Sequence, residues 1–459
     1  MNNSVNKTIV IIITCLTSFI IPFMGSSINI CLPAIDKEFG MNVVSLSWIA
    51  TAYLLTSSIF ILPFGRIADI YGRKKIYLYG ISLFTITSLI SGLSVSAAML
   101  ITARVIQGIA SAMIAGTGMA ILSSVFSEGE RGKIFGINTA TVYIGLASGP
   151  FIGGILTGYL GWRSVFLVII PLCLISVIMI LTSFKTEWTE AKSEKFDIKG
   201  SVLYSIVLLA IIYGLSLLPR YPGIIILSAG LILFPVFIKW ETKSVYPMLN
   251  IELFRSNIVF GFSNLAALLN YCGTFAVGFT LSLYLQYVKG LTPHSAGMIL
   301  VSQPIIMSVC SPLTGWLSDK IEPRILASLG MLLSSISLAA FIFITPETQN
   351  IFIISNLIIL GLGFSLFSSP NVNAIMGSVE KKYYGVASST LSTMRSTGQM
   401  ISMAIAMLVF ALFIGKESIN PQNIKTFVSS IRVIFIIMTA MSFFGIFASY
   451  ARGKVNKIK

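Results

Sequence analysis

Arg104 has the most unusual chemical setting in this sequence, because it lies inside a long apolar stretch. The polar or small residues that accompany it at helical spacing are Gln107, Gly108 and Ser111, which would share its face of a helix. An arginine within a membrane-spanning helix is costly and indicates a polar partner or a water-filled cavity. The alternative is an arginine near the end of the helix whose side chain extends to the membrane surface. We predict a functional polar face and keep the surface-directed arginine as the alternative.

Two similar segments lie far apart in the chain. Their shared pattern is a glycine, an aspartate four residues later and basic residues beyond it: Gly65, Asp69, Gly72 and Arg73 in the first segment, and Gly315, Asp319 and Arg324 in the second. A glycine permits two helices to approach closely, and an aspartate can accept hydrogen bonds from the N-terminal amides of a neighbouring helix. Such a latch could hold one conformation and release another. The alternative is that the basic residues only orient the chain in a membrane.

A third pattern combines closely spaced glycines with a proline. Its members are Gly145, Gly149, Pro150, Gly153 and Gly154. Glycines four apart line one helix face and allow tight backbone contact, while the proline removes one helix hydrogen bond and bends the helix. The pattern predicts a bent helix that packs closely on a neighbour.

These residues lie in an all-α membrane protein. Of the 459 residues, 55% are hydrophobic and only 10% are charged, whereas soluble domains carry about 25% charged residues. The apolar runs are continuous and long enough for membrane helices of about 20 residues, and barrel strands would alternate instead. We predict fourteen membrane-spanning helices, at 8–33, 45–64, 76–95, 97–121, 134–160, 164–183, 200–218, 223–239, 257–284, 294–316, 325–344, 351–376, 385–414 and 428–450.

The basic residues predict the orientation. If the N-terminus is cytoplasmic and the number of spans is even, most lysines and arginines outside the spans lie on the cytoplasmic side. Both termini are therefore expected in the cytoplasm, and topology explains the net charge of +15 without a nucleic-acid partner. The two aspartate segments indicate two six-helix halves, 1–184 and 257–459. The segment 185–256 would link them and add two helices.

The chain resembles the major facilitator superfamily over its whole length, and in particular the fourteen-helix drug:proton antiporter branch. The aspartate segments are similar to the signature loop of that family, although Ile70 stands where the family prefers arginine. Arg104, Gln107 and Gly108 are similar to its fourth-helix motif, whose arginine is associated with proton coupling. The glycine–proline pattern resembles the fifth-helix motif of its antiporters. The resemblance implies alternating access between two halves and export of lipophilic, often cationic drugs in exchange for protons.

One departure concerns the first helix. Met24 stands where that branch carries an acidic residue, and every aspartate and glutamate of this chain is predicted at a helix end or in a loop. A buried acid can bind either a proton or a cationic drug, so its absence favours a neutral or anionic substrate beside Arg104 and Arg395. Alternatively, proton coupling rests on Asp69 or on Asp36, which we place just outside the first span.

The substrate cavity is expected among polar and aromatic residues within the apolar spans. The candidates are Asn29, Tyr53, Gln107, Asn138, Asn270, Tyr271, Gln303, Asn371, Arg395 and Gln399. The alternative for each amide is a hydrogen bond between helices, worth about 0.6 kcal/mol on average. Helix breaks at Pro304 and Pro370 would expose backbone carbonyls to the pathway.

The sequence favours a secondary transporter in the plasma membrane, working as a monomer. We expect proton-coupled efflux of small lipophilic or drug-like compounds, and the alternative is transport of a specific neutral or anionic metabolite. An enzyme is disfavoured because the chain has one histidine and neither a G-x-S-x-G nor an H-E-x-x-H motif. We expect no metal and no cofactor, and the absence of a P-loop motif argues against ATP as the energy source.

Overall fold

A computed structural model of the protein describes residues 6–126, 128–184, 186–189, 196–218, 220–244, 247–249, 251–379, 384–415 and 419–453. All regular structure within these residues is helical, as predicted. The helices are α1 (Lys7–Phe39), α2 (Val43–Tyr71), α3 (Arg73–Gly92), α4 (Ala97–Val125), α5 (Glu128–Leu160), α6 (Arg163–Leu167), α7 (Ile170–Ser183), α8 (Ile198–Leu217), α9 (Tyr221–Glu241), α10 (Ile251–Ser256), α11 (Ile258–Thr274), α12 (Val277–Leu283), the π-helical turn η1 (Tyr284–Val288), α13 (Pro293–Leu300), α14 (Ser302–Lys320), α15 (Pro323–Phe341), α16 (Asn350–Gly377), α17 (Tyr384–Phe413) and α18 (Ile424–Ala451).

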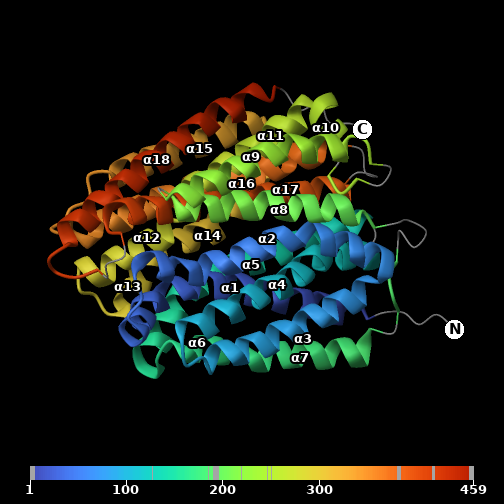
Figure 1. Cartoon of the computed structure of the whole chain (residues 1–459). Coiled ribbons are helices and arrows are strands. Elements are labelled where there is room, and N and C mark those ends of the chain that lie inside the picture. Colours follow the sequence, from blue (N-terminus) through green and yellow to red (C-terminus); the bar gives the residue numbers. More distant parts are fainter. Residues whose placement is uncertain are drawn as a thin grey trace.

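Each predicted span coincides with one helix or with consecutive helices. Among the described residues, 13 helical stretches are long and apolar enough to cross a membrane, and α3, a helix of 20 residues, occupies the remaining predicted span. The helices run along a common axis, with the start of α1 and the end of α18 at the same end of the bundle (Figure 1). We call this the terminal end and the opposite one the distal end.

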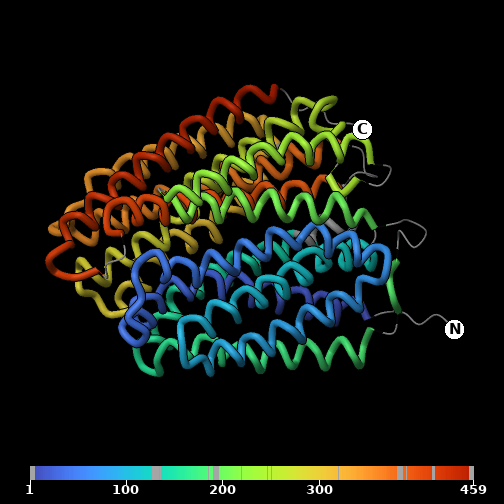
Figure 2. Tube along the Cα trace, in the orientation of Figure 1, coloured from blue at the N-terminus to red at the C-terminus, as the bar shows by residue number. Residues whose placement is uncertain are grey.

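The packing follows the same plan in the first part of the chain, before α6, and in its last part, from α11 onward. In the first, α1 packs on α5, α2 on α4, and α3 on α4; in the last, α11 packs on α17, α14 on α16, and α15 on α16. Figure 2 shows the two groups separately, the blue-to-teal segments below and the orange-to-red ones above. Helix α8 packs on both α2 and α17, so it spans the seam between the groups. This repeat agrees with two six-helix halves, and the domain limits at 184 and 256 stay a prediction.

Three prolines behave differently from expectation. The first span does not end near Pro33, because α1 continues to Phe39 and ends where Gly40 adopts a left-handed φ of 60°. Asp36 therefore lies inside the helix rather than just beyond it. Pro370 lies within an uninterrupted α16, so the predicted break there is wrong. The break predicted at Pro304 falls at Val301, between α13 and α14. Pro304 itself lies in the first turn of α14, where a backbone amide has no partner within the helix, so the proline is tolerated there.

Candidate functional site

The Arg104 guanidinium is fully buried between α4 and α2. Its Nε donates to the Ile49 carbonyl at 3.0 Å, and one terminal nitrogen donates to Gln107 Oε1 at 2.6 Å. Its central carbon lies 4.2 Å from the centroid of the Tyr53 ring. With 0% exposure, the side chain does not extend to the membrane surface, so that alternative is wrong.

The other residues of this face complete a polar network. Gln107 Nε2 donates to Ser88 Oγ at 2.8 Å, and the Tyr53 hydroxyl donates to Ser111 Oγ at 2.7 Å. Gly108 is required sterically, because a Cβ atom there would lie 2.4 Å from the Tyr53 carbonyl oxygen. The second terminal nitrogen of Arg104 is buried without a partner in the described part of the chain. The site therefore retains one free donor.

In the first signature segment, the aspartate pairs with its own arginine. Asp69 Oδ1 accepts from Arg73 at 2.7 Å, and Arg73 also donates to the Ala120 carbonyl at 3.1 Å and to Ser124 Oγ at 2.6 Å. Arg73 thus ties the α2–α3 turn to the end of α4. The predicted hydrogen bonds from helix amides to Asp69 stay a prediction.

Residues that follow α7 cover this turn, and sequence reasoning missed them. Glu187 Oε1 accepts from the Lys74 amide at 2.8 Å, and the Trp188 carbonyl accepts from the Arg73 amide at 3.0 Å. Gly72 has a φ of 125°, and a Cβ atom there would lie 2.5 Å from the Glu187 carboxyl carbon. A glycine is therefore needed at this turn for its backbone conformation and for space.

The second signature segment is built differently. Arg324 lies 3.5 Å from Glu322 and 5.1 Å from the centroid of the Tyr450 ring, and the side chain of Asp319 is outside the described part of the structure. The nearest atom to a Cβ at Gly65 would be 3.7 Å away, and at Gly315 3.9 Å away. Both are ordinary contacts, so neither glycine is needed for close helix approach.

Arg452, another residue that sequence reasoning missed, joins four helices at the terminal end. It follows α18 and donates to Asn371 Oδ1 at 2.8 Å, to Ser263 Oγ at 3.2 Å and to the Pro323 carbonyl at 2.8 Å. Burial lowers the pKa of its guanidinium to about 10, which leaves it charged at neutral pH. Because Arg452 directly follows the last span, the sequence indicated only a role in orienting the chain in the membrane.

The glycine–proline pattern of α5 packs against two other helices, α1 and α13. Toward α1, a Cβ atom at Gly145 would lie 2.5 Å from the Phe19 carbonyl oxygen, and one at Gly153 would lie 2.9 Å from Ser27 Cβ. Gly149 also faces α1, and its carbonyl accepts from Ser27 Oγ at 3.0 Å. The predicted close packing is therefore present within the first half.

The remaining two members of the pattern lie on the seam between the halves. A Cβ atom at Gly154 would lie 2.8 Å from the Pro293 carbonyl oxygen, and one at Gly297 of α13 would lie 2.1 Å from the Pro150 carbonyl oxygen. Helix α5 thus makes close backbone contacts both inside its half and across the seam.

Polar contacts close the seam at the distal end. The Tyr287 hydroxyl donates to the Asp36 carboxylate, and Ser282 Oγ donates to the Asn29 carbonyl at 2.6 Å. Tyr287 lies in the π-helical turn η1, a distortion that is frequent at functional sites. Asp36 is therefore a bridging group between the halves.

An aromatic cluster occupies the middle of the seam. Tyr143 of α5 packs with Tyr271, Met307 and Phe364 of the second half. The Tyr143 hydroxyl lies 3.1 Å from Ser368 Oγ, and Tyr271 and Phe364 stack edge to face at 5.4 Å. The Arg395 guanidinium carbon lies 5.8 Å from the centroid of Tyr271, and its Nε is buried without a partner in the described part.

The other predicted cavity residues are spread over the bundle. Asn138 accepts from Ser18 Oγ at 2.7 Å, and Asn371 is engaged by Arg452, so both join helices. Both side-chain atoms of the fully buried Asn270 lack a partner among the described residues. Gln303 and Gln399 are partly buried, and the structure does not bring them into either cluster.

Comparisons with known proteins place these features in context. The family model described as Major Facilitator Superfamily matches residues 14–266 and 263–457. The riboflavin transporter RibZ of Clostridioides difficile is 31% identical over 427 residues, covering 92% of each chain. The multidrug resistance protein Stp of Mycobacterium tuberculosis is 30% identical over 421 residues, covering 89% of this chain and 77% of Stp.

A solved structure gives the same fold. The crystal structure of the peptide transporter POT in complex with sulfate aligns with a TM-score of 0.69 at 15% identity, covering 94% of this chain and 93% of that one. At this identity the match concerns the fold alone.

Proposed function

Because the chain belongs to the Major Facilitator Superfamily, and is thus a multi-pass membrane transporter rather than an enzyme, we propose that it exports small lipophilic or drug-like compounds in exchange for protons. A multidrug resistance protein among its relatives supports efflux. The glycine–proline pattern of α5 supports the antiporter mode, since it resembles the motif of antiporters. We place the transporter in the plasma membrane as a monomer, with the terminal end in the cytoplasm.

The observation that carries this proposal is the aromatic cluster on the seam. Tyr143, Tyr271 and Phe364 come from both halves and offer ring faces and edges, and Met307 adds an adaptable side chain. Such a lining suits apolar or aromatic compounds better than strongly hydrated ones. Arg395 beside Tyr271 adds one cationic donor.

Transport proceeds by alternating access in this proposal. The bonds of Asp36 and Asn29 with α12 and η1 hold the distal end closed. Rocking of the halves breaks these bonds, while the α2–α3 turn and its Asp69–Arg73 pair rearrange at the terminal end. Proton binding at Asp36, at Asp69 or near Arg104 would bias this equilibrium.

A second candidate function is transport of a specific neutral or anionic metabolite. The riboflavin transporter among the relatives favours it. So does the chemistry of the two clusters, because Arg104 and Arg395 make no ion pair with a carboxylate among the described residues. Two unpaired guanidinium groups repel a cationic drug and attract an anion or a polar carbonyl group.

Transport assays on purified protein in liposomes separate the candidates. We expect the protein to move lipophilic aromatic compounds, and expect their accumulation to fall when an uncoupler collapses the proton gradient. Accumulation that is indifferent to the gradient overturns proton coupling. Selective transport of one neutral or anionic metabolite, lost in Arg395→Ala, supports the second candidate instead. If that variant transports every anionic compound normally, the second candidate is wrong for anions.

A further inference from the structure

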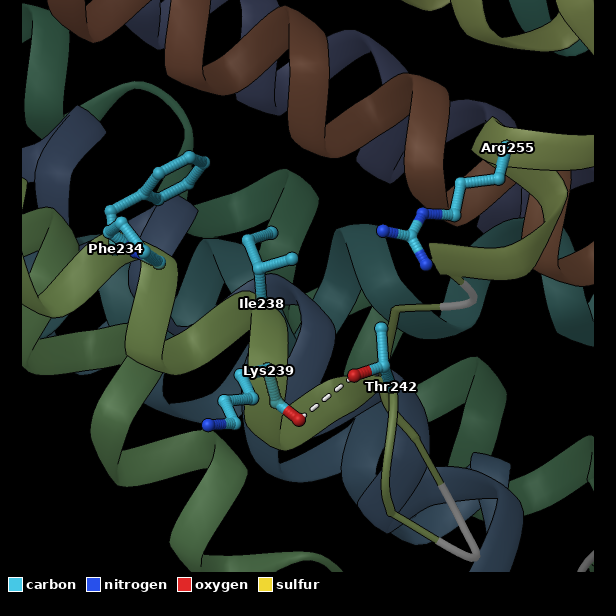
Figure 3. Close-up of a pocket in the computed structure, with 6 residues that line it drawn as sticks. Phe234, Ile238, Lys239, Thr242 and Arg255 are labelled. Carbon is cyan, nitrogen blue, oxygen red and sulfur yellow. Dashed lines mark hydrogen bonds between the residues drawn. The ribbon is translucent and has the colours of Figure 1, made fainter.

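A groove lies at the terminal end of α9, outside the sites described above. It has a volume of about 390 Å³ and is lined by Phe234, Pro235, Ile238, Lys239, Thr242 and Arg255. Three of these residues, Phe234, Ile238 and Thr242, follow one another at intervals of four and share one face of the helix. Figure 3 shows the Arg255 guanidinium reaching from α10 toward this face, with Ile238 and Thr242 opposite it.

The lining divides into an apolar part and a cationic part. Phe234, Pro235 and Ile238 form the apolar wall, whereas Lys239 and Arg255 carry positive charges, and none of the described residues that line the groove is acidic. Arg255 makes no hydrogen bond or ion pair with any described residue, although Glu252 lies on the same short helix.

Two further acids near the groove are engaged elsewhere. Asp197 accepts from Trp240 Nε1 at 3.0 Å and from Ser244 Oγ at 3.0 Å. Glu241 is buried and accepts from the Leu249 amide at 2.9 Å. Among the described residues, no carboxylate therefore forms an ion pair with Lys239 or Arg255.

The groove lies where a membrane surface is expected. The hydrophobic window of α9 is only 17% buried inside the protein, and Ile232, Phe234 and Val236 are exposed on it, so this helix faces lipid. Trp240 follows at the helix end, and tryptophan is enriched at the boundary between acyl chains and water. Lys239 and Arg255 thus lie at the depth of lipid headgroups.

We propose that this groove binds an anionic phospholipid. The phosphate group accepts hydrogen bonds from the planar guanidinium of Arg255 and lies near the Lys239 ammonium, while an acyl chain packs along Phe234 and Ile238. A zwitterionic lipid is disfavoured, because its ammonium group would approach two cations. Free phosphate is disfavoured because it would leave the apolar wall uncovered.

Lipid retention on the purified full-length protein tests the proposal. Native mass spectrometry would compare phosphatidylglycerol with phosphatidylcholine of the same acyl chains. We expect K239Q/R255Q to lose about 30-fold in affinity for phosphatidylglycerol, since each basic side chain at the surface contributes about fivefold. The matched control is K199Q/K243Q, which removes two charges of the same region that do not line the groove.

Two further measurements separate a lipid site from general electrostatics. Phe234→Gln removes part of the apolar wall without changing charge, and we expect it to lower phosphatidylglycerol binding while leaving thermal stability unchanged, because Phe234 is exposed. We expect inorganic phosphate not to displace the lipid. Equal losses in both double variants, equal retention of the two lipids by the wild type, or displacement by phosphate would each overturn the proposal.

Discussion

Breaking the hydrogen bond between Asp36 and Tyr287 should open the distal end of the seam. The bond joins α1 of the first half to η1 of the second, so it exists only while this end is closed. In the open state both groups would be hydrated. Tyr287→Phe removes the donor and leaves the ring in place.

The size of the effect follows from the type of bond. A hydrogen bond to a charged group contributes about 1.5–3 kcal/mol, which corresponds to a shift of roughly 10- to 150-fold in the ratio of closed to open molecules. The labelling experiment places its cysteine at Ser282, so the neighbouring bond from Ser282 to the Asn29 carbonyl is lost in parent and variant alike, and the comparison isolates the Tyr287 bond.

Labelling of a buried cysteine measures this shift. The native cysteines form no disulfides, so they can be replaced by serine, and Ser282→Cys then introduces one thiol at a position with 0% exposure on the seam. A membrane-impermeant thiol reagent added from the distal side should react about tenfold faster or more when Tyr287→Phe is also present.

The same turn offers a matched control. Tyr284 lies one helical turn earlier in η1 and donates to the Thr345 carbonyl within its own half. Tyr284→Phe loses a tyrosine hydroxyl of the same helix without touching the seam, so labelling should stay at the parent rate. Equal labelling rates in both phenylalanine variants would refute the role of Asp36 and Tyr287 in closure.

Three other substitutions test the remaining parts of the site. Gly297→Ala should lower the stability of the protein by about 1–3 kcal/mol, because the new methyl group would lie 2.1 Å from the Pro150 carbonyl oxygen. The control Gly158→Ala should leave the stability unchanged, because the nearest atom to its methyl group would be 4.0 Å away. Arg452→Gln should destabilise the protein by about 1–3 kcal/mol for each acceptor left unpaired, and an unchanged melting temperature in detergent would contradict its structural role. Arg104→Lys should reduce transport about tenfold or more at unchanged protein abundance, because a lysine ammonium cannot replace the planar guanidinium group that lies over the Tyr53 ring. Full transport by this variant would show that Arg104 only contributes to packing.

Much of the fold could be predicted because its signals are local. The length and apolarity of each span, the helical spacing of Arg104 and Gln107, and the glycines of α5 are all properties of short segments. Each of them reappears in the structure as a helix or as a shared face.

The missed residues act over long distances in the sequence. Glu187 reaches the Lys74 amide across 113 positions, and Arg452 reaches Asn371 across 81. Neither belongs to a local pattern, and an arginine after a span is also what topology alone requires. The failed prediction at Pro370 has a related cause, because the packing of a long helix can outweigh the loss of one backbone hydrogen bond.

The polar bonds between the halves are few among the described residues, which suits a transporter. Glycine contacts bring α5 close to the backbone of α1 inside the first half and to that of α13 across the seam. Between the halves, the described residues form five hydrogen bonds, from Thr51, Tyr143, Ser282, Gln286 and Tyr287. At about 0.5–1.5 kcal/mol each, with the bond to Asp36 stronger, they sum to several kcal/mol.

That sum has the size that a reversible switch needs. A ligand reverses an equilibrium from 1:99 to 99:1 if it favours one state by about 5.5 kcal/mol. In the proposed mechanism, substrate binding at the aromatic cluster and proton binding at Asp36 would together supply this amount, because both groups lie on the seam itself. Far stronger bonds across the seam would lock the distal end closed, so the modest polar character of these contacts is what alternating access requires.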